Sequence, residues 1–224
     1  MTQAAPIIEP VRLRITEIFH SLQGETRTMG LPTVFVRLTG CPLRCVYCDT
    51  AYAFTGGEMR SLEGIIEEVS AYQPRYITVT GGEPLAQPNC LPLLSALCDL
   101  DPAPEVSLET SGALDVSGVD PRVVTILDLK TPASGESHRN RWENLAHLKP
   151  KDQIKFVICD RGDYEWARFK LSEHQLHERC EVLFSPSFEQ LPGADLAAWI
   201  LEDRLPVRMQ LQLHKLLWGD EPGR

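Results

Sequence analysis

The segment TVFVRLTGCPLRCVYCDT, residues 33–50, joins a strand pattern to three closely spaced cysteines. Its first part, TVFVRLTG at 33–40, is rich in β-branched and aromatic residues, which favour a β-strand. Cys41, Cys45 and Cys48 follow at once and are close enough in sequence to bind one metal centre. A closed tetrahedral thiolate site takes four ligands, and no fourth cysteine follows nearby. The segment therefore predicts a strand that leads into an incomplete metal site.

Strand and helix patterns alternate over most of the remaining chain. The further predicted strands are 75–84, 105–112, 123–130, 153–159, 181–185 and 207–213. The predicted helices are 61–72, 90–100, 139–148, 164–179 and 194–203. Strands joined by helical crossovers form a parallel sheet in an α/β protein. A complete (β/α) barrel takes about 250 residues, so these 224 residues predict an incomplete barrel with about six or seven mostly parallel strands. We expect one domain, 1–224.

Polar and glycine-rich motifs follow several of these strands directly. They are TGC, TGGEP at 80–84, ETSG at 109–112 and DLKTP at 128–132. The carboxyl ends of parallel barrel strands share one face, and functional sites are assembled there. The position of these motifs indicates that the cysteines belong to an active site.

Composition narrows the class of protein. The chain has 22 basic and 31 acidic residues, a formal charge of −9, which argues against broad binding to nucleic acid. Hydrophobic residues make up 43%, enough for a full core. The N-terminus has no signal-peptide pattern, and no apolar run approaches the roughly 20 residues that span a bilayer. We therefore expect a cytoplasmic protein with no membrane contact.

Three kinds of site compete for the cysteine cluster. Cys45 and Cys48 could form half of a structural zinc site, but no second pair of Cys or His ligands is evident. A redox dithiol needs only two cysteines and leaves Cys41 unexplained. An iron–sulfur cluster held by three thiolates leaves one iron with an open position, as catalytic metal sites do. The other four cysteines fall in apolar patterns and are expected to be buried: Cys90, Cys98, Cys159 and Cys180.

The spacing CxxxCxxC, together with Tyr47 and TGGEP, resembles the radical S-adenosylmethionine (SAM) superfamily. A narrower resemblance, to the 7-carboxy-7-deazaguanine synthase family, rests on IFHSLQGET at 18–26, VRLTGCPLRCVYCDT at 36–50, TGGEP, ETSG and LHK at 213–215. It implies conversion of 6-carboxy-5,6,7,8-tetrahydropterin to 7-carboxy-7-deazaguanine, a queuosine precursor, with loss of ammonia. It also implies a 4Fe–4S cluster, SAM and Mg²⁺ as cofactors, a homodimer, and an electron donor such as flavodoxin.

The resemblance also implies roles for individual residues. The cluster ligands would be Cys41, Cys45 and Cys48, and the magnesium ligand would be Thr50. The SAM contacts would be Tyr47, Cys48, Asp49, Gly82 and Lys130. The substrate contacts would be Leu22, Gln23, Gly24, Arg37, Thr80 and His214.

Each of these residues also has a simpler interpretation. Arg37 could pair with Glu25 or Glu109, Thr50 could be a turn hydroxyl, and His214 could be exposed beside Lys215. Two other functions stay open: a radical SAM activase acting on a protein partner, and a zinc-stabilised module without catalysis. The chain also departs from the family pattern at Asp128-Leu129, at Ser185-Pro186 and at its C-terminus, where we hypothesise that Asp220 or Glu221 supplies a substrate-binding carboxylate.

Overall fold

The computed structural model describes residues 11–219, 221 and 223. Within this part of the chain, nine strands form one sheet in the order β3-β1-β2-β4-β5-β6-β7-β8-β9. Neighbours are parallel from β2 to β9, whereas β1 is antiparallel to both β2 and β3. The strands are β1 (Arg12–Leu22), β2 (Pro32–Leu38), β3 (Glu58–Ser61), β4 (Tyr76–Gly81), β5 (Glu105–Thr110), β6 (Val124–Asp128), β7 (Gln153–Ile158), β8 (Glu181–Pro186) and β9 (Arg208–Met209).

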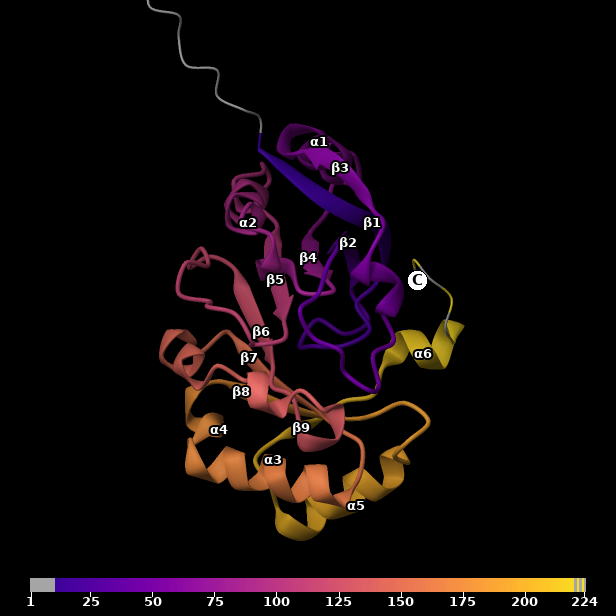
Figure 1. Ribbon diagram of the computed structural model, residues 1–224, viewed down its shortest axis with the longest axis vertical. Helices are drawn as coiled ribbons and strands as arrows, with labels where there is room; N and C mark the ends of the chain where they lie inside the picture. Colours follow the sequence, from indigo (N-terminus) through magenta and orange to yellow (C-terminus); the bar gives the residue numbers. More distant parts are fainter. Residues whose placement is uncertain (1–10, 220, 222, 224) are drawn as a thin grey trace, which may run out of the picture.

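Five helices of the described chain pack against one face of the sheet: α1 (Leu62–Ala71), α2 (Cys90–Cys98), α3 (Arg161–Glu173), α4 (Leu176–Arg179) and α5 (Gly193–Asp203). The sixth, α6 (Leu213–Trp218), lies apart from them (Figure 1). One apolar cluster joins α1 and α2 to the first strands, and a second joins α3, α4 and α5 to the last ones. The incomplete (β/α) barrel expected from the sequence is confirmed.

Alternation along the strands separates this core from the inner face of the sheet. On β2, Val34, Val36 and Leu38 are fully buried in the first apolar cluster. The residues between them, Phe35 and Arg37, face a cavity on the other side. The sheet therefore buries apolar side chains under the helices and presents polar ones inside the curve of the barrel.

The structure differs from the expected elements in four places. The predicted helix 164–179 is divided into α3 and α4, because Gln175 adopts the left-handed backbone conformation between them. Strands β1 and β3 were not expected. They pair antiparallel with each other, and β1 also pairs antiparallel with β2, so they stand outside the regular alternation of parallel strands and helices. The segment 139–148 forms short 3₁₀ turns rather than an α-helix. Asn144 explains part of this, since its side chain bonds the backbone of Gly112, Leu114 and Val116 and ties the segment to a loop. The last predicted strand, 207–213, is reduced to Arg208–Met209.

The C-terminal segment crosses the open side of the sheet. Gln210 makes two side-chain hydrogen bonds with the backbone of Thr26, each 2.8 Å long. The Leu213 N–H then donates to the Gly24 carbonyl at 2.9 Å, so α6 begins beside the loop that follows β1 (Figure 1). This crossing brings residues far apart in sequence to one site. No helix in the described ranges is both long and apolar enough to span a membrane.

Candidate active site

A cavity of about 410 Å³ opens at the carboxyl ends of the parallel strands. Its lining includes every residue to which the family resemblance gave a role: Leu22, Gln23, Gly24, Arg37, Cys41, Cys45, Tyr47, Cys48, Asp49, Thr50, Thr80, Gly82, Lys130 and His214. These residues come from β1, β2, β4, the loops after four strands, and α6. The structure therefore brings the predicted residues together, and the role of each stays a prediction.

Backbone N–H groups hold the cysteine loop, residues 41–50, against the segment that follows β6. The Val46 N–H donates to the Ser134 carbonyl at 3.0 Å, and the Arg44 N–H donates to Glu136 at 2.7 Å. Cys41, Cys45 and Cys48 are free thiols and only partly exposed. Burial raises the pKa of Cys45 to about 11, although the Lys130 charge opposes this. Iron would therefore have to displace thiol protons when it binds, because thiolates are the ligands.

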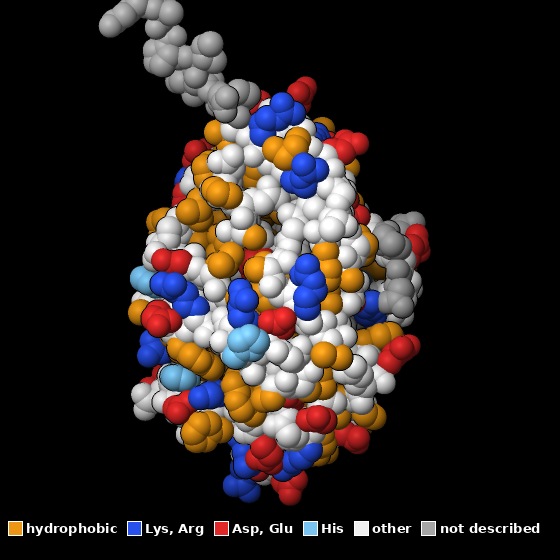
Figure 2. All heavy atoms as spheres, viewed as in Figure 1, with side chains coloured by type: hydrophobic (Ala, Val, Ile, Leu, Met, Phe, Trp, Pro, Cys, Tyr) orange, Lys and Arg blue, Asp and Glu red, His pale blue; other side chains and the backbone are white. Residues whose placement is uncertain are grey.

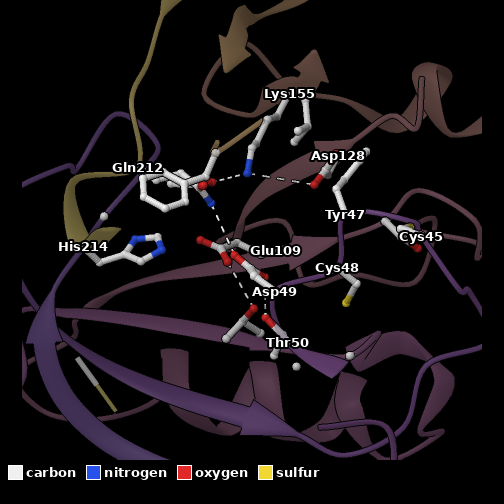
Figure 3. A pocket seen from close by; sticks show the side chains of 18 of the residues that line it. Cys45, Tyr47, Cys48, Asp49, Thr50, Glu109, Asp128, Lys155, Gln212 and His214 are labelled. Atoms are coloured by element: carbon white, nitrogen blue, oxygen red, sulfur yellow. Dashed lines mark hydrogen bonds and ion pairs between the residues drawn. The ribbon is translucent and has the colours of Figure 1, made fainter. Parts of the chain in front are cut away.

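A single metal ion and an iron–sulfur cluster place different demands on three cysteine ligands. A zinc ion at about 2.3 Å from each sulfur would draw its ligands tightly around one point. Among the described residues, no three His, Cys, Asp or Glu side chains converge in that way. Figure 3 shows Cys45 and Cys48 at the edge of the cavity, on either side of the chain that carries Tyr47. In a polynuclear iron–sulfur cluster each cysteine binds a different iron atom, so the three thiols need not converge on one point.

The TGGEP segment packs directly on the cysteine loop. A Cβ atom added to Gly82 would lie 2.4 Å from the Gly40 carbonyl oxygen and 2.7 Å from the Cys41 Cβ atom. Glu83 is fully buried, and its carboxylate accepts hydrogen bonds from the Ser111 N–H at 2.7 Å and from the Thr110 hydroxyl at 2.8 Å. The glycine permits close approach of two loops, and the glutamate fixes one of them to the ETSG motif.

Two buried oxygen atoms at the cavity have no hydrogen-bond partner in the described part of the chain. They are the Tyr47 hydroxyl and Oδ1 of Asp128. The other Asp128 oxygen, Oδ2, lies 3.0 Å from Lys130 Nζ. Buried polar atoms normally have partners, so these two indicate that a polar ligand completes the site. Of the two residues that depart from the family pattern here, Asp128 lines the cavity and Leu129 is buried in the core.

The loop after β1 and the strand β4 place an amide and a hydroxyl group around one carboxylate. Gln23 Nε2 donates to Glu109 at 3.3 Å, and the Thr80 hydroxyl donates to Glu109 at 3.1 Å. Gly24 lies against His214, because a Cβ atom added there would be 2.0 Å from Nδ1 of the imidazole. Burial lowers the pKa of His214, against the opposing charges of Glu25 and Asp49. His214 is therefore a partly buried side chain at the cavity whose neutral form is favoured, not an exposed one.

Arg37 has a partner that the sequence did not indicate. Its Nε atom pairs with Glu17 Oε1 at 2.7 Å, rather than with Glu25 or Glu109. The Tyr52 hydroxyl donates to the same oxygen at 2.8 Å. Glu17 stands opposite Arg37 in the β1–β2 register. The pair orients the guanidinium at the cavity wall, where it remains a candidate for binding an anion.

Asp49 and Thr50 supply neighbouring oxygen atoms. The Thr50 hydroxyl donates to Asp49 Oδ1 at 2.7 Å (Figure 3). Gln212 Nε2 donates to Glu25 at 2.8 Å and lies 3.4 Å from the other Asp49 oxygen. A carboxylate and a hydroxyl together offer more oxygen ligands for magnesium than a hydroxyl alone.

Several charged or polar residues of the cavity were missed from the sequence: Glu25, Glu109, Asp128, Lys155 and Gln212. A signal was present for two of them. Lys155 interrupts the mostly apolar strand QIKFVI, whereas Glu109 lies on the polar side of the alternating strand EVSLET. A charged residue on such a strand faces away from the helix-covered core, into the barrel, where it needs a partner.

Ser185 and Glu221, the other described residues at which the chain departs from the family pattern, lie outside the cavity. Ser185 is buried and does not line the cavity, although Ser187 and Phe188 do. Glu221 is exposed and is also absent from the lining, so the geometry gives no support for its proposed carboxylate role. Asp220 lies outside the described residues.

Comparisons with known proteins agree with this site. Residues 35–128 match the model of the Radical SAM superfamily. A 7-carboxy-7-deazaguanine synthase of Chlorobaculum tepidum is 46% identical over 93% of this chain and 96% of its own length. A 7-carboxy-7-deazaguanine synthase of Koribacter versatilis is 44% identical over 93% of this chain and 98% of its own length. The crystal structure of QueE from Escherichia coli has a TM-score of 0.74 and 22% identity, covering 91% of this chain and 95% of that one. The chain therefore belongs to the 7-carboxy-7-deazaguanine synthase family of radical SAM enzymes.

Proposed function

We propose that this protein converts 6-carboxy-5,6,7,8-tetrahydropterin to 7-carboxy-7-deazaguanine and ammonia. The observation that carries the proposal is one cavity that holds the cysteine loop on one side and the Leu22–Gly24 segment on the other. The family assignment over nearly the whole chain supports the same reaction. It also speaks against a zinc-stabilised module without catalysis.

The cysteine side of the cavity suits the family's cofactors. Cys41, Cys45 and Cys48 would hold the 4Fe–4S cluster, leaving one iron for SAM. Together these groups supply a carbon-centred radical that abstracts hydrogen from the substrate. The unpartnered Tyr47 hydroxyl and the Lys130 ammonium group face this side, where they can bind polar groups of SAM. Gly82 leaves room for the loops to meet. Asp49 follows Cys48 directly and lines the same cavity, where it can contact SAM.

The opposite side suits a heterocycle with many N–H groups and one carboxylate. Glu109 and Gln23 offer acceptors for ring N–H groups, and the Leu22 and Gly24 backbone borders them. Arg37 can pair with the substrate carboxylate. Thr80 and His214 close the same side.

Turnover separates the proposal from a radical SAM activase. Anaerobically reduced protein, given SAM and carboxytetrahydropterin, should release ammonia and form a deazapurine in equal amounts, both measured by chromatography and mass spectrometry. SAM should persist, because the radical takes its hydrogen back from the cofactor product. If SAM is cleaved but no deazapurine forms, while a glycyl radical appears on an added protein partner, the activase is the correct function.

Thr50 is proposed as the magnesium ligand, with the neighbouring Asp49 as a second oxygen donor. Replacing Thr50 by valine removes the hydroxyl and keeps the side-chain shape, so the Mg²⁺ concentration for half-maximal rate should rise about tenfold. Titration of turnover with Mg²⁺ measures this. Thr55→Val is the matched control, because Thr55 is exposed and lies outside the cavity. Equal Mg²⁺ dependence in both variants would remove Thr50 from the metal site.

The remaining expectations concern partners and place in the cell. We propose a homodimer, a flavodoxin-like electron donor, a cytoplasmic location and a single domain over residues 1–224. Figure 2 shows acidic and basic side chains interspersed over the visible face. This mixture and the charge of −9 fit a small-molecule enzyme better than a nucleic-acid binder.

A further inference from the structure

Glu17 and Tyr52 meet behind the cavity wall, and the roles above leave both residues unused. Glu17 lies on β1, opposite Arg37 of β2. Tyr52 lies in the 3₁₀ turn Ala51–Phe54, which follows the cysteine loop. Neither of the two residues lines the cavity, whereas Arg37 does. They can therefore influence a ligand through Arg37 rather than by touching it.

One oxygen of Glu17 fixes one edge of the Arg37 guanidinium. Arg37 Nε donates to Glu17 Oε1 at 2.7 Å, and only 15% of the Arg37 side chain and 21% of the Glu17 side chain are exposed. Among the described residues, neither Nη nitrogen of Arg37 has a hydrogen-bond partner. A guanidinium holds its N–H groups in a rigid planar fork, so a bond at Nε sets the direction of both Nη groups. These groups are left for an anion in the cavity.

Two aromatic rings restrict the same guanidinium. Arg37 Cζ lies 5.8 Å from the centroid of the Phe19 ring and 5.8 Å from that of the Tyr52 ring. Phe19 is itself stacked on Phe35, with ring centroids 4.9 Å apart. Contacts of this kind attract the cation and limit the tilt of its plane. Arg37 is thus held by a carboxylate at one edge and by two rings.

Tyr52 connects this arrangement to the cysteine loop. Its hydroxyl donates to the same Glu17 oxygen at 2.8 Å. The turn that carries Tyr52 is closed against the start of the loop, because the Gly40 N–H donates to the Ala53 carbonyl at 2.8 Å and Ala53 is fully buried. The orientation of Arg37 is therefore tied to the loop that would hold the cluster.

We propose that Glu17 and Tyr52 are positioning residues that hold the Arg37 guanidinium in a fixed orientation, relative to the cysteine loop, to receive the carboxylate of the substrate. This inference rests on the proposed function, since it takes that carboxylate to be the ligand of Arg37. The negative charge of Glu17 by itself repels a second carboxylate. Glu17 therefore aids binding only if fixed orientation outweighs this repulsion, and the sign of its effect on affinity decides between the two.

The test compares the binding of 6-carboxytetrahydropterin and of tetrahydropterin, which lacks the carboxylate, to Glu17→Ala by anaerobic calorimetry on reconstituted protein. Affinity for the carboxylated pterin should fall about tenfold, which is the worth of one charge-assisted hydrogen bond. Affinity for tetrahydropterin should stay native, whereas a general packing defect would lower both. Glu68→Gln is the matched control, because it breaks an ion pair with Arg60 outside the cavity and should leave both affinities native.

A double-mutant cycle shows whether Glu17 acts through Arg37. Arg37→Met alone should lower the affinity for the carboxylated pterin at least about tenfold, and adding Glu17→Ala should cause no further loss. Tyr52→Phe removes only the hydroxyl and should cause about a threefold loss in the native background. If Glu17→Ala does not fold, native affinity for the carboxylated pterin in Tyr52→Phe overturns the inference instead.

Three other results would also overturn it: native or increased affinity for the carboxylated pterin in Glu17→Ala, an equal loss for both pterins, or an equal loss with and without Arg37. Failure of the native protein itself to bind carboxytetrahydropterin would instead refute the proposed function, before any variant is compared.

Discussion

Replacing Cys41, Cys45 or Cys48 by alanine is expected to abolish SAM cleavage. All three cysteines line the cavity. A cluster that already has one iron without a protein ligand should not stay intact and able to bind SAM when a second iron loses its ligand. Iron and sulfide per chain should fall, and the visible absorption of the cluster should weaken or vanish. Formation of 5′-deoxyadenosine under reducing conditions should drop to background in all three variants.

Cys98→Ala is the matched control for this series. Cys98 is buried on α2 among Leu94 and other apolar residues and does not line the cavity. Its replacement should cost about 1 kcal/mol of stability, through lost packing, and leave iron content unchanged. Cluster loss in Cys98→Ala comparable to that in Cys45→Ala, or native SAM cleavage in Cys45→Ala, would contradict the assignment of the ligands.

The parts of the site that could be predicted from the sequence are those encoded within short segments. The cysteine spacing and the TGGEP motif define local loops, so no knowledge of distant partners is needed to find them. The placement after strands then follows from the parallel topology, in which the carboxyl ends of the strands share one face. That is why residues from β1 to α6 were expected in one site and are found in one cavity.

The parts that could not be predicted depend on pairing across the sheet. The partner of Arg37 is Glu17, which stands opposite it only because β1 pairs antiparallel with β2. Because β1 was not predicted, the partners considered for Arg37 were Glu25 and Glu109, which belong to the LQGE and ETSG motifs. Lys155 shows the same limit: its strand pattern predicts a buried charge, but its partners come from a loop and from β6. Such networks are set by the curvature of the sheet, which a single sequence does not reveal.

Gly82→Ala is expected to disable the site without removing a single ligand. The added methyl group would lie 2.4 Å from the Gly40 carbonyl oxygen and 2.7 Å from Cys41 Cβ, atoms of the loop backbone and its first side-chain carbon that cannot rotate away. The Glu83 N–H also donates to the Gly40 carbonyl at 2.8 Å, so the two loops cannot separate freely. Cys41 must shift, and geometry misplaced by about 1 Å can cost about a hundredfold in rate.

The measurement for Gly82→Ala is iron content together with SAM affinity after identical anaerobic reconstitution. We expect substoichiometric iron and at least about tenfold weaker SAM binding, whereas the fold persists because Glu83 remains tied to Thr110 and Ser111. Gly64→Ala is the control: this glycine lies in α1, where a Cβ atom meets only the Ser61 hydroxyl at 3.2 Å. That variant should keep native iron and gain up to about 1 kcal/mol from helix propensity. Native iron and SAM affinity in Gly82→Ala would show that the cysteine loop yields, and that close packing against TGGEP does not position Cys41.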